Sequence, residues 1–340
     1  MAEADPRTLI CFSGGKDSTA MLLRMLELGE KIHGIAFADT KREFPELYEY
    51  IEFIQKYLDE HYPHLRADGV VIEMLEPVHD FDEWMHGKAE RGRHEGKVRG
   101  LPLHTFPCWY ARNAKLRPLE YKKRDGKFDI SCVGIAIDES HRTSLVDPAL
   151  RYPLCEWGWT EQDCIQYLEK LGIPNPLYKV FARLGCFHCH KQGLASWWGV
   201  WKNYPDLWLE SVKLDEAGAA IDGRRLRPDS TPLTDLAERF ENGFVPEGKY
   251  EGDCQTCKAV AFNAVGLVGM EEFFEIDDAL EKDLIIKQAR IDSFKRSAEK
   301  KRREQDTKHD GLKLKQTKQT MDSMFDCTTD EDEDPEVCGI

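Results

Sequence analysis

A glycine-rich segment near the N-terminus has the residue types that bind phosphate. Ser13-Gly-Gly-Lys-Asp-Ser18, followed by Thr19, lies between an apolar run at residues 8–12 and a helical pattern. Glycines let backbone N–H groups approach an anion, and the helix N-terminus and the Lys16 ammonium add positive charge. The spacing from glycine to lysine is too short for the P-loop of kinases and GTPases. The sequence therefore predicts a different phosphate or pyrophosphate site, made by Ser13, Gly14, Gly15, Lys16, Asp17, Ser18 and Thr19.

Charged residues follow two further apolar runs, where strands of a parallel sheet would end. Asp39 comes after the second apolar run, and Glu139 and Arg142 come after the run at residues 130–137. Ligands bind at the carboxyl edge of open parallel sheets. Asp39 is therefore a candidate to hold Mg²⁺ or a ribose, and Arg142 a candidate to bind phosphate while Glu139 orients it. Gly134 would let adenine or phosphate approach the backbone. A turn aspartate and an ordinary surface ion pair are the structural alternatives.

Two Cys-x-x-Cys pairs, Cys186-Phe-His-Cys189 and Cys254-Gln-Thr-Cys257, supply candidate metal ligands. Two thiolates at this spacing bind one tetrahedral ion or two corners of an iron–sulfur cluster. The second pair is predicted to bind a separate zinc ion, to complete the first site or to act as a redox dithiol.

The 340-residue chain is acidic, with 62 Asp and Glu against 47 Lys and Arg and a formal charge of −15. Its hydrophobic content of 41% excludes global disorder. No run approaches the roughly 18–20 apolar residues that a membrane span needs, and the N-terminus lacks the features of a secretory signal. We therefore expect a cytoplasmic protein with no membrane contact, whose eleven cysteines do not form a disulfide framework.

Positive charge is nevertheless concentrated in two segments. The Gly-rich segment 87–100 carries five Lys and Arg residues, and residues 112–124 carry six. An anionic small molecule or a nucleic-acid strand as acceptor would explain this charge, and a solvated basic face is the alternative. Trp109 and Tyr110 are suited either to stack bases or to pack in the core.

Strand and helix signals alternate along the first part of the chain. Apolar runs and helical patterns follow one another at residues 8–12, 17–28, 32–37, 45–58 and 70–72. Another strand is expected at residues 130–137, and Thr160 is expected to cap a helix. This order predicts an α/β fold with a Rossmann-like parallel sheet and helices on both faces, followed by a Cys- and Trp-rich helical segment at residues 185–208.

The glycine-rich segment resembles the PP-loop of the adenine nucleotide alpha hydrolases, and further segments resemble the phosphoadenosine phosphosulfate (PAPS) reductase-like branch of that superfamily. These segments are Ala38-Asp-Thr-Lys-Arg-Glu-Phe-Pro-Glu-Leu-Tyr48, Cys108 with Lys115-Leu-Arg-Pro118, Val133-Gly-Ile-Ala-Ile-Asp-Glu-Ser-His-Arg142, Tyr152-Pro-Leu, Trp159-Thr-Glu, Asn175-Pro-Leu-Tyr178 and Gly185-Cys-Phe-His-Cys189. The resemblance covers about residues 8–205. The gap from Cys108 to Lys115 is longer than in the family, and Ala136 replaces a common arginine.

The resemblance implies an enzyme that binds an adenine nucleotide. The intact loop with Lys16 favours ATP, because authentic PAPS reductases usually lack this lysine. The resemblance also implies that Cys108 joins Cys186 and Cys189 in holding a [4Fe-4S] cluster, with Zn²⁺ or reduced thiols as alternatives. Candidates for a fourth ligand are Cys155, His188 and His190.

The last residues, Glu336-Val-Cys-Gly-Ile340, resemble the C-terminal segment in which PAPS reductases carry a nucleophilic cysteine. The match would make Cys338 a catalytic thiol. The family's following histidine is absent, and the surrounding acidic residues should raise the thiol pKa. We therefore favour a chance resemblance at this position.

Composition divides the chain into three predicted parts. Residues 1–215 are expected to form a PP-loop nucleotide-binding domain, residues 216–265 an insertion or a small Cys-containing segment, and residues 266–340 a charged helical tail, partly disordered. Residues 295–318 carry a net charge of +6 and residues 322–340 a net charge of −8, a pattern typical of solvated tails.

Three functions compete. In the first, an acceptor oxygen attacks the α-phosphorus of ATP, pyrophosphate leaves, and sulfur carried by a persulfide or a metal-bound thiolate then displaces AMP. A thiol reductant or a sulfur donor protein would be the partner. Lys16 would stabilise pyrophosphate, Asp39 would hold Mg²⁺, and the three cysteines would handle sulfur. The alternatives are reduction of PAPS or adenylyl sulfate by Cys338, and a non-catalytic nucleotide-binding module.

Overall fold

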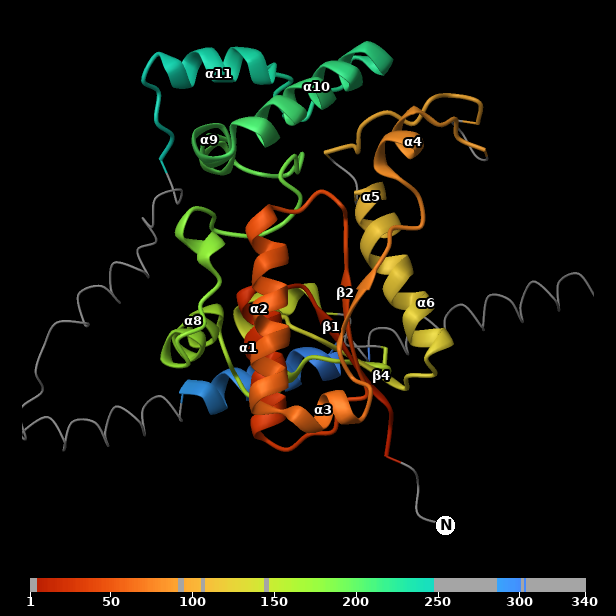
Figure 1. Ribbon diagram of the computed structural model, residues 1–340, viewed down its shortest axis with the longest axis vertical. Coiled ribbons are helices and arrows are strands. Elements are labelled where there is room, and N and C mark those ends of the chain that lie inside the picture. Colours follow the sequence, from red (N-terminus) through yellow and green to blue (C-terminus); the bar gives the residue numbers. More distant parts are fainter. Residues whose placement is uncertain are drawn as a thin grey trace, which may run out of the picture.

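The computed structural model describes residues 5–90, 95–104, 108–143, 147–247, 286–300 and 303. Its centre is a five-stranded parallel sheet in the order β3-β2-β1-β4-β5 (Figure 1). The strands are β1 (Thr8–Phe12), β2 (Gly34–Ala38), β3 (Ile72–Leu75), β4 (Ile130–Val133) and β5 (Leu150–Arg151). The predicted Rossmann-like α/β sheet is confirmed.

The helices connect and flank these strands. They are α1 (Lys16–Glu27), α2 (Pro45–His61), α3 (Pro63–Ala67), α4 (Phe81–His86), α5 (Trp109–Ala111), α6 (Arg117–Asp125), α7 (Pro153–Glu156), α8 (Glu161–Lys170), α9 (Leu194–Asn203), α10 (Pro205–Asp222) and α11 (Leu233–Glu241). In Figure 1, α1, α2 and α8 lie on one side of the sheet and α6 lies on the other. The predicted capping of α8 is confirmed, because Thr160 and Asp163 form a reciprocal capping box.

Side chains along β1 alternate between the two faces of the sheet, as the two-residue period of a strand requires. Ile10 and Phe12 belong to the large core that includes α1 and α2. Leu9 belongs to a smaller cluster with Phe128 and with Leu119 of α6. Both faces of the sheet are therefore covered by apolar contacts.

The strand predicted at residues 130–137 is shorter than expected, because β4 ends at Val133. The Ile135 N–H donates to the Val133 carbonyl at 3.0 Å, and the Ile137 N–H donates to the Trp159 carbonyl at 2.8 Å. These bonds take the chain out of the sheet and into the 3₁₀ turn η2 (Ile137–Arg142). This turn, and not a longer strand, carries the charged residues predicted to follow the strand.

Helices α9, α10 and α11 form a layer beyond the end of the sheet at which β2 terminates (Figure 1). The rings of Trp197 and Trp208 lie 6.1 Å apart, and the ring of Phe240 lies 6.2 Å from that of Trp208. Arg42, in the segment after β2, forms an ion pair with Glu210 of α10 and ties this layer to the sheet. Helix α10 runs through residue 215, where the sequence analysis placed a boundary.

A helical stretch at residues 286–300 packs near the start of α8. The Lys287 ammonium lies 3.6 Å from the Asp163 carboxylate, and Phe294 packs against a cluster that includes Ile135 and Tyr152. Within the described ranges, no helix is both long enough and apolar enough to span a membrane.

Candidate functional site

The glycine-rich loop between β1 and α1 is held by residues that lie far from it in the sequence. Gly14 has a φ of +68°, and a Cβ there would lie 2.7 Å from Leu47 Cδ1. The Asn175 Nδ2–H donates to the Gly14 carbonyl at 2.8 Å. The Lys16 N–H donates to the Tyr178 hydroxyl at 3.1 Å. Glycine is therefore required at position 14 both for its backbone conformation and for the space.

Ser18 and Thr19 stabilise the loop from inside. The Ser18 Oγ accepts the Ser13 N–H at 3.1 Å, and the Thr19 hydroxyl donates to the Gly15 carbonyl at 2.9 Å. Both side chains are buried and do not line the pocket. No side chain of Gly15 caps α1, and the Lys16 N–H donates to Tyr178, so the N–H groups of this helix that face an anion are those after Lys16.

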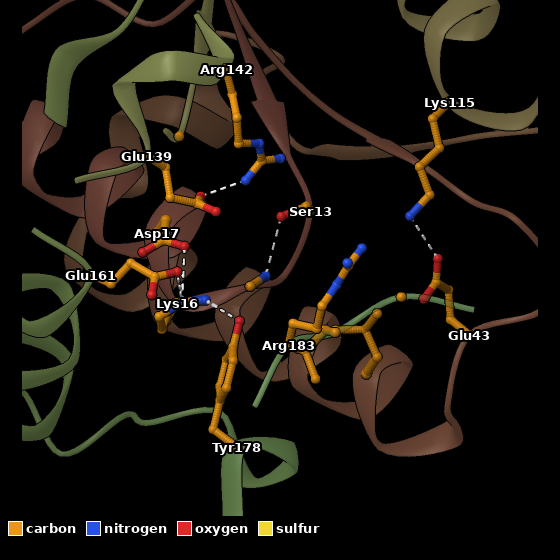
Figure 2. A pocket seen from close by; sticks show the side chains of 15 residues that line it. Ser13, Lys16, Asp17, Glu43, Lys115, Glu139, Arg142, Glu161, Tyr178 and Arg183 are labelled. Atoms are coloured by element: carbon orange, nitrogen blue, oxygen red, sulfur yellow. Dashed lines mark hydrogen bonds and ion pairs between the residues drawn. The ribbon is translucent and has the colours of Figure 1, made fainter. Parts of the chain in front are cut away.

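The loop forms one wall of a pocket of about 440 Å³, shown in Figure 2 and called here the phosphate pocket. Most of the predicted phosphate-site residues line it, namely Ser13, Gly15, Lys16, Asp17, Gly134, Glu139 and Arg142. The other lining residues are Glu43, Leu47, Lys115, Glu161, Tyr178, Arg183, Leu184 and Gly185.

The ammonium of Lys16 is already paired. Its Nζ lies 2.7 Å from Glu161 Oε1 and 3.2 Å from Asp17 Oδ2, and 5.2 Å from the centroid of the Tyr178 ring. Burial lowers the pKa of Lys16, but its attraction to Tyr178, Asp17 and Glu161 outweighs burial and raises the pKa overall. Lys16 is therefore cationic at neutral pH, and a phosphate must compete with two carboxylates for it.

Three carboxylates meet beside Lys16. Oxygens of Asp17, Glu139 and Glu161 all lie within 4.8 Å of one another. Burial raises the pKa of Asp17 to about 6, against the opposing attraction of Lys16 and with further repulsion from Glu161 and Glu139. Asp17 Oδ1 is buried without a hydrogen-bond partner in the described part of the chain. An oxygen of this kind needs a donor or a cation.

Two further ion pairs, and one cation that has no partner among the described residues, complete the charges of the pocket. Arg142 pairs with Glu139 at 2.5 Å, and the Lys115 ammonium donates to Glu43 at 3.0 Å. Arg183 points into the pocket in Figure 2 and forms no hydrogen bond or ion pair with any residue that the structure describes. The four basic side chains of the lining are matched by four acidic ones.

Asp39 does not line the phosphate pocket. Its carboxylate accepts the Lys41 N–H at 2.7 Å and the Tyr48 hydroxyl at 2.8 Å, and lies 3.1 Å from the Lys41 ammonium. The residue is 2% exposed. Its predicted contact with Mg²⁺ or ribose stays a prediction, and the carboxylates that do reach the pocket come from other elements.

Gly134 lines the pocket and also permits a close contact inside the protein. A Cβ there would lie 2.7 Å from Ser18 Cα and 2.8 Å from Ser18 N. Gly134 therefore lets the first turn of α1 pack closely against it. We had expected it to let the ligand approach the backbone. Ala136, in the place of the family's arginine, is fully buried and cannot substitute for a cation.

Cys108, Cys186 and Cys189 lie together next to the phosphate pocket and are called here the cysteine corner. Cys186 follows Gly185 of the pocket wall. Burial raises the pKa of Cys186 to about 12, with a further contribution from Glu43 and an opposing one from Lys115. Burial also raises the pKa of Cys108, which feels the charge of Cys189. Burial therefore favours the neutral thiol over the thiolate at Cys186 and at Cys108.

The cysteine corner is not a preformed zinc site. Thiolates on one tetrahedral zinc ion lie about 4 Å apart. In the part of the chain that the structure describes, no cysteine belongs to a group of three ligand atoms within 4.8 Å of one another. The thiolates of a four-iron cluster bind different irons, so this limit does not apply to such a cluster.

His188 lies between Cys186 and Cys189, and His190 directly follows Cys189. Nε2 of His188 and of His190 is buried without a partner among the described residues. Burial lowers the pKa of His188 to about 3 and that of His190 to about 4, so both rings are neutral. They remain candidates for a fourth ligand. Cys155 is not one, because it lies in a separate apolar cluster and donates to the Ile135 carbonyl.

The remaining predicted cysteines, Cys254, Cys257 and Cys338, lie outside the described residues. The long spacing between Cys108 and Lys115 contains the π-helical turn η1 (Arg112–Leu116), which joins α5 to α6. A π turn widens the helix locally and is frequent at functional sites. Here it carries Lys115 into the wall of the phosphate pocket.

A model of the phosphoadenosine phosphosulfate reductase domain matches residues 7–192, which is more than half of the sequence. The chain belongs to this family. An uncharacterized protein of Methanocaldococcus jannaschii is 27% identical over 213 residues, which cover 59% of this chain and 39% of that protein. The chain thus spans about two fifths of the length of this relative.

The chain also has low similarity to two solved structures. One is a phosphoadenylyl-sulfate reductase from Candida auris in a phosphate complex, with a TM-score of 0.35, 15% identity, and coverage of 54% of this chain and 83% of that one. The other is the U34-tRNA thiolase NcsA from Methanococcus maripaludis with its [4Fe-4S] cluster, with a TM-score of 0.33, 12% identity, and coverage of 78% and 83%. Family membership rests on the sequence match.

Several pocket residues of this PAPS reductase-family chain carry no sequence signal for a role in the site. Glu161 ends the segment Trp159-Thr-Glu and Tyr178 ends the segment Asn175-Pro-Leu-Tyr, and both segments indicate the family without indicating a role. Arg183 lies outside every motif that the sequence analysis used. Their place in the site follows only from the three-dimensional structure.

Proposed function

We propose that the chain binds Mg²⁺·ATP in the phosphate pocket and activates an acceptor for sulfur transfer with release of pyrophosphate. The observation that carries this proposal is the meeting of Asp17, Glu139 and Glu161 beside Lys16. Three carboxylates repel a bare polyphosphate, whereas a nucleotide that brings a divalent cation turns them into ligands. PAPS already carries its sulfonyl group and needs no pyrophosphate release, so its reduction leaves this acidic group without a role.

The residues present fit a magnesium ion. Asp17, Glu139 and Glu161 offer carboxylate oxygens, and Asp17 Oδ1 lacks a partner among the described residues. Bound there, Mg²⁺ would neutralise charge that develops on the leaving pyrophosphate. Lys16 exchanges its two carboxylate partners for phosphate oxygens as the nucleotide binds. Arg183 and the N-terminus of α1 supply further positive charge to the phosphate chain.

The proposed reaction has two displacements. The acceptor oxygen forms a bond to the α-phosphorus as the bond from that phosphorus to the β-bridging oxygen breaks, and pyrophosphate leaves against Lys16. A sulfur nucleophile then attacks the acceptor carbon, and AMP leaves with the original oxygen. Hydrosulfide completes the transfer directly, whereas a donor persulfide leaves a mixed disulfide that a second thiol must reduce to release the product. The cysteine corner lies next to the pocket, so it is the candidate place for the sulfur.

The cysteine corner fits a metal centre through its donors. Cys108, Cys186 and Cys189 offer three thiols, and the buried Nε2 atoms of His188 and His190 have no described partner. An iron–sulfur cluster bound there would hold the sulfurs as thiolates at neutral pH. The protein alone keeps the Cys186 thiol protonated, since burial raises its pKa to about 12.

Pyrophosphate release tests this function. Purified wild-type protein is incubated with ATP, Mg²⁺, hydrosulfide and candidate acceptors, and pyrophosphate is measured by a coupled assay. Acceptor-dependent release that is lost in Lys16→Ala and kept in Lys31→Ala supports the proposal, because Lys31 is an exposed lysine paired with Asp5. Release that ignores Lys16, or none with any acceptor, contradicts it.

Family membership favours one alternative, the reduction of PAPS or adenylyl sulfate with Cys338 as nucleophile. In that reaction the thiol sulfur attacks the sulfonyl sulfur, the nucleotide leaves, and a dithiol reduces the thiosulfonate to release sulfite. Sulfite formation from either nucleotide with a thiol reductant, lost in Cys338→Ser and independent of Mg²⁺, would select this alternative over the ATP-dependent one.

A further inference from the structure

A second pocket, of about 940 Å³, lies between α4, the segment at residues 97–103 and the end of α10. We call it the tryptophan pocket. Its lining shares no residue with the phosphate pocket and is mainly apolar, with Trp84 and Trp109 among its walls. Its volume is in the range of about 300–1,000 Å³ typical of small-molecule sites. Nothing in the proposed ATP chemistry uses this pocket.

The pocket contains a stack of planar groups. The ring of His79 lies 3.9 Å from that of Trp84 at an interplanar angle of 12°, and the guanidinium carbon of Arg99 lies 3.7 Å from the same ring centre. Two groups this close to one ring centre must occupy its opposite faces. The guanidinium group of Arg99 therefore lies over the face of Trp84 that His79 leaves open, and Arg99 lines the pocket. Guanidinium planes and indoles are the surfaces on which proteins stack unpaired bases.

The charges around the pocket favour an anion. Lys97 and Arg99 line it, and neither forms an ion pair with any acidic residue that the structure describes. Segment 87–100 holds five Lys and Arg residues against two Glu, in a chain whose formal charge is −15. Nε1 of Trp109 is buried and has no hydrogen-bond partner among the described residues, which leaves a donor for a ligand or for water. A planar, anionic ligand matches all three features.

The tryptophan pocket also adjoins the cysteine corner. Trp109 of its wall follows Cys108 directly, just as Gly185 of the phosphate pocket precedes Cys186. The rings of His104, next to Leu103 of the wall, and His190 lie 5.3 Å apart. A ligand held in the tryptophan pocket is therefore beside the thiols that the proposed function assigns to sulfur.

We propose that the tryptophan pocket binds an unpaired base of a single-stranded nucleic acid, which is the acceptor, by stacking it on Arg99. The role of the strand as acceptor rests on the proposed function. The binding of the strand to the tryptophan pocket does not depend on it. A strand fits better than a free nucleotide, because Lys97 of the lining and Lys88 outside it are both exposed and offer positive charge to more than one phosphate. Stacking is a property of every base, so little sequence preference is expected.

The test measures binding without ATP, by fluorescence anisotropy of labelled 12-nucleotide single strands of DNA and of RNA on the full chain. One strand is abasic at every position, which keeps the phosphates and removes all the bases. The variants are Arg99→Lys, which keeps the charge and loses the plane, and Arg66→Gln as a control for a distant exposed arginine. Thermal unfolding confirms that each variant is folded.

We expect one or both strands to bind the wild type, and Arg99→Lys to weaken binding about fivefold or more, as the loss of one stacked base would. Arg66→Gln and Lys16→Ala should bind as the wild type does. With Arg99→Lys, the abasic strand should bind as well as the intact strand. Because Lys16→Ala abolishes the proposed reaction without touching this pocket, failure of one proposal does not imply failure of the other.

Three results would overturn the inference. One is the absence of binding of both strands at 50 mM salt. Another is equal affinity of the wild type for intact and abasic strands, which would indicate attraction by charge alone and needs no variant. The third is displacement of the strand by AMP at equal base concentration, which would show a site for a free nucleotide.

Discussion

The phosphate pocket and the cysteine corner are neighbours, but their polar groups are in opposite states. In the phosphate pocket, Lys16 is paired with Asp17 and Glu161, Arg142 with Glu139, and Lys115 with Glu43. In the cysteine corner, by contrast, burial keeps the Cys186 thiol neutral, and buried ring nitrogens of His188 and His190 have no described partner.

In the phosphate pocket, a ligand must replace ion-pair partners that are already present. In the cysteine corner, a ligand must supply partners that are missing. The phosphate pocket is balanced without ligand, so a polyanion binds only if it brings positive charge or displaces a carboxylate. The cysteine corner buries polar atoms at a cost until something satisfies them. Nucleotide binding in the phosphate pocket should therefore depend on divalent cations. The cysteine corner should satisfy its polar groups by holding a metal centre.

The largest expected effect concerns the cysteine corner. Cys186→Ser should remove most of the metal from anaerobically purified protein, because it deletes one of three thiols. Cys155→Ser is the matched control, since Cys155 is buried outside the corner. Metal analysis and visible absorption give the answer. Full metal content in Cys186→Ser, or a wild type without metal, would contradict the claim that the cysteine corner holds a metal centre.

Lys16→Ala should weaken the binding of Mg²⁺·ATP about 10- to 100-fold, the range expected when hydrogen bonds from a charged group, worth about 1.5–3 kcal/mol, are lost. Equilibrium dialysis with labelled ATP measures this change. Lys31→Ala removes an exposed lysine elsewhere and should bind normally. A Lys16 variant within twofold of the wild type would mean that the pocket does not hold the phosphates.

Gly134→Ala should lower the free energy of unfolding by about 1–3 kcal/mol, the usual cost of overpacking, because the new Cβ would meet the Ser18 backbone at 2.7 Å. Gly185→Ala is its control in the same pocket wall, where a Cβ would meet nothing within 4 Å. Urea unfolding compares the two. Equal stability of the two variants would show that residue 134 does not lie against the backbone of Ser18.

Protonation of Asp17 should show in the pH dependence of stability. Burial raises its pKa from 3.8 to about 6, so between these values the folded state binds more protons than the unfolded state. The free energy of unfolding of the wild type, relative to Asp17→Asn, should therefore fall by about 1–3 kcal/mol as the pH rises from 4 to 6.5. Urea unfolding across this range checks the sign, and a rise would refute the burial argument.

The smallest effect is expected from Glu161→Gln. Glu161 holds Lys16 at 2.7 Å, but its side chain is 42% exposed, so the pair contributes only about 0.2–1 kcal/mol. Without Mg²⁺, ATP should therefore bind this variant about two- to fivefold more tightly than the wild type. Dialysis in chelator tests this, with Glu156→Gln as a control on a different helix. Weaker binding would mean that Glu161 assists phosphate binding directly.

Local sequence patterns predicted the elements that stand next to one another in the chain. The loop from Ser13 to Thr19, β1, α1 and the cap at Thr160 were each readable from a few adjacent residues. The end of β4 was not, because it depends on a bond from Ile137 to Trp159. The period of apolar residues does not report such long-range contacts.

The same limit applies to the site: its local motif was predictable from the sequence, and the residues that join it from distant segments were not. Glycine spacing indicated the phosphate loop, but Glu161, Tyr178 and Arg183 enter the pocket from segments about 150 residues further along the chain. Asp39 was placed correctly after β2, yet the Tyr48 hydroxyl and the Lys41 N–H hold its carboxylate away from the pocket. Which way a carboxylate points depends on its partners, which the residue type alone does not specify.

Calorimetric titration of the wild-type chain with ATP, in Mg²⁺ and then in chelator, tests the central claim most directly, with PAPS as the competing ligand. Because three carboxylates face the phosphates, we predict binding of ATP that requires Mg²⁺ and exceeds the binding of PAPS. ATP binding of equal affinity in chelator, or tighter binding of PAPS without any metal, would contradict the account.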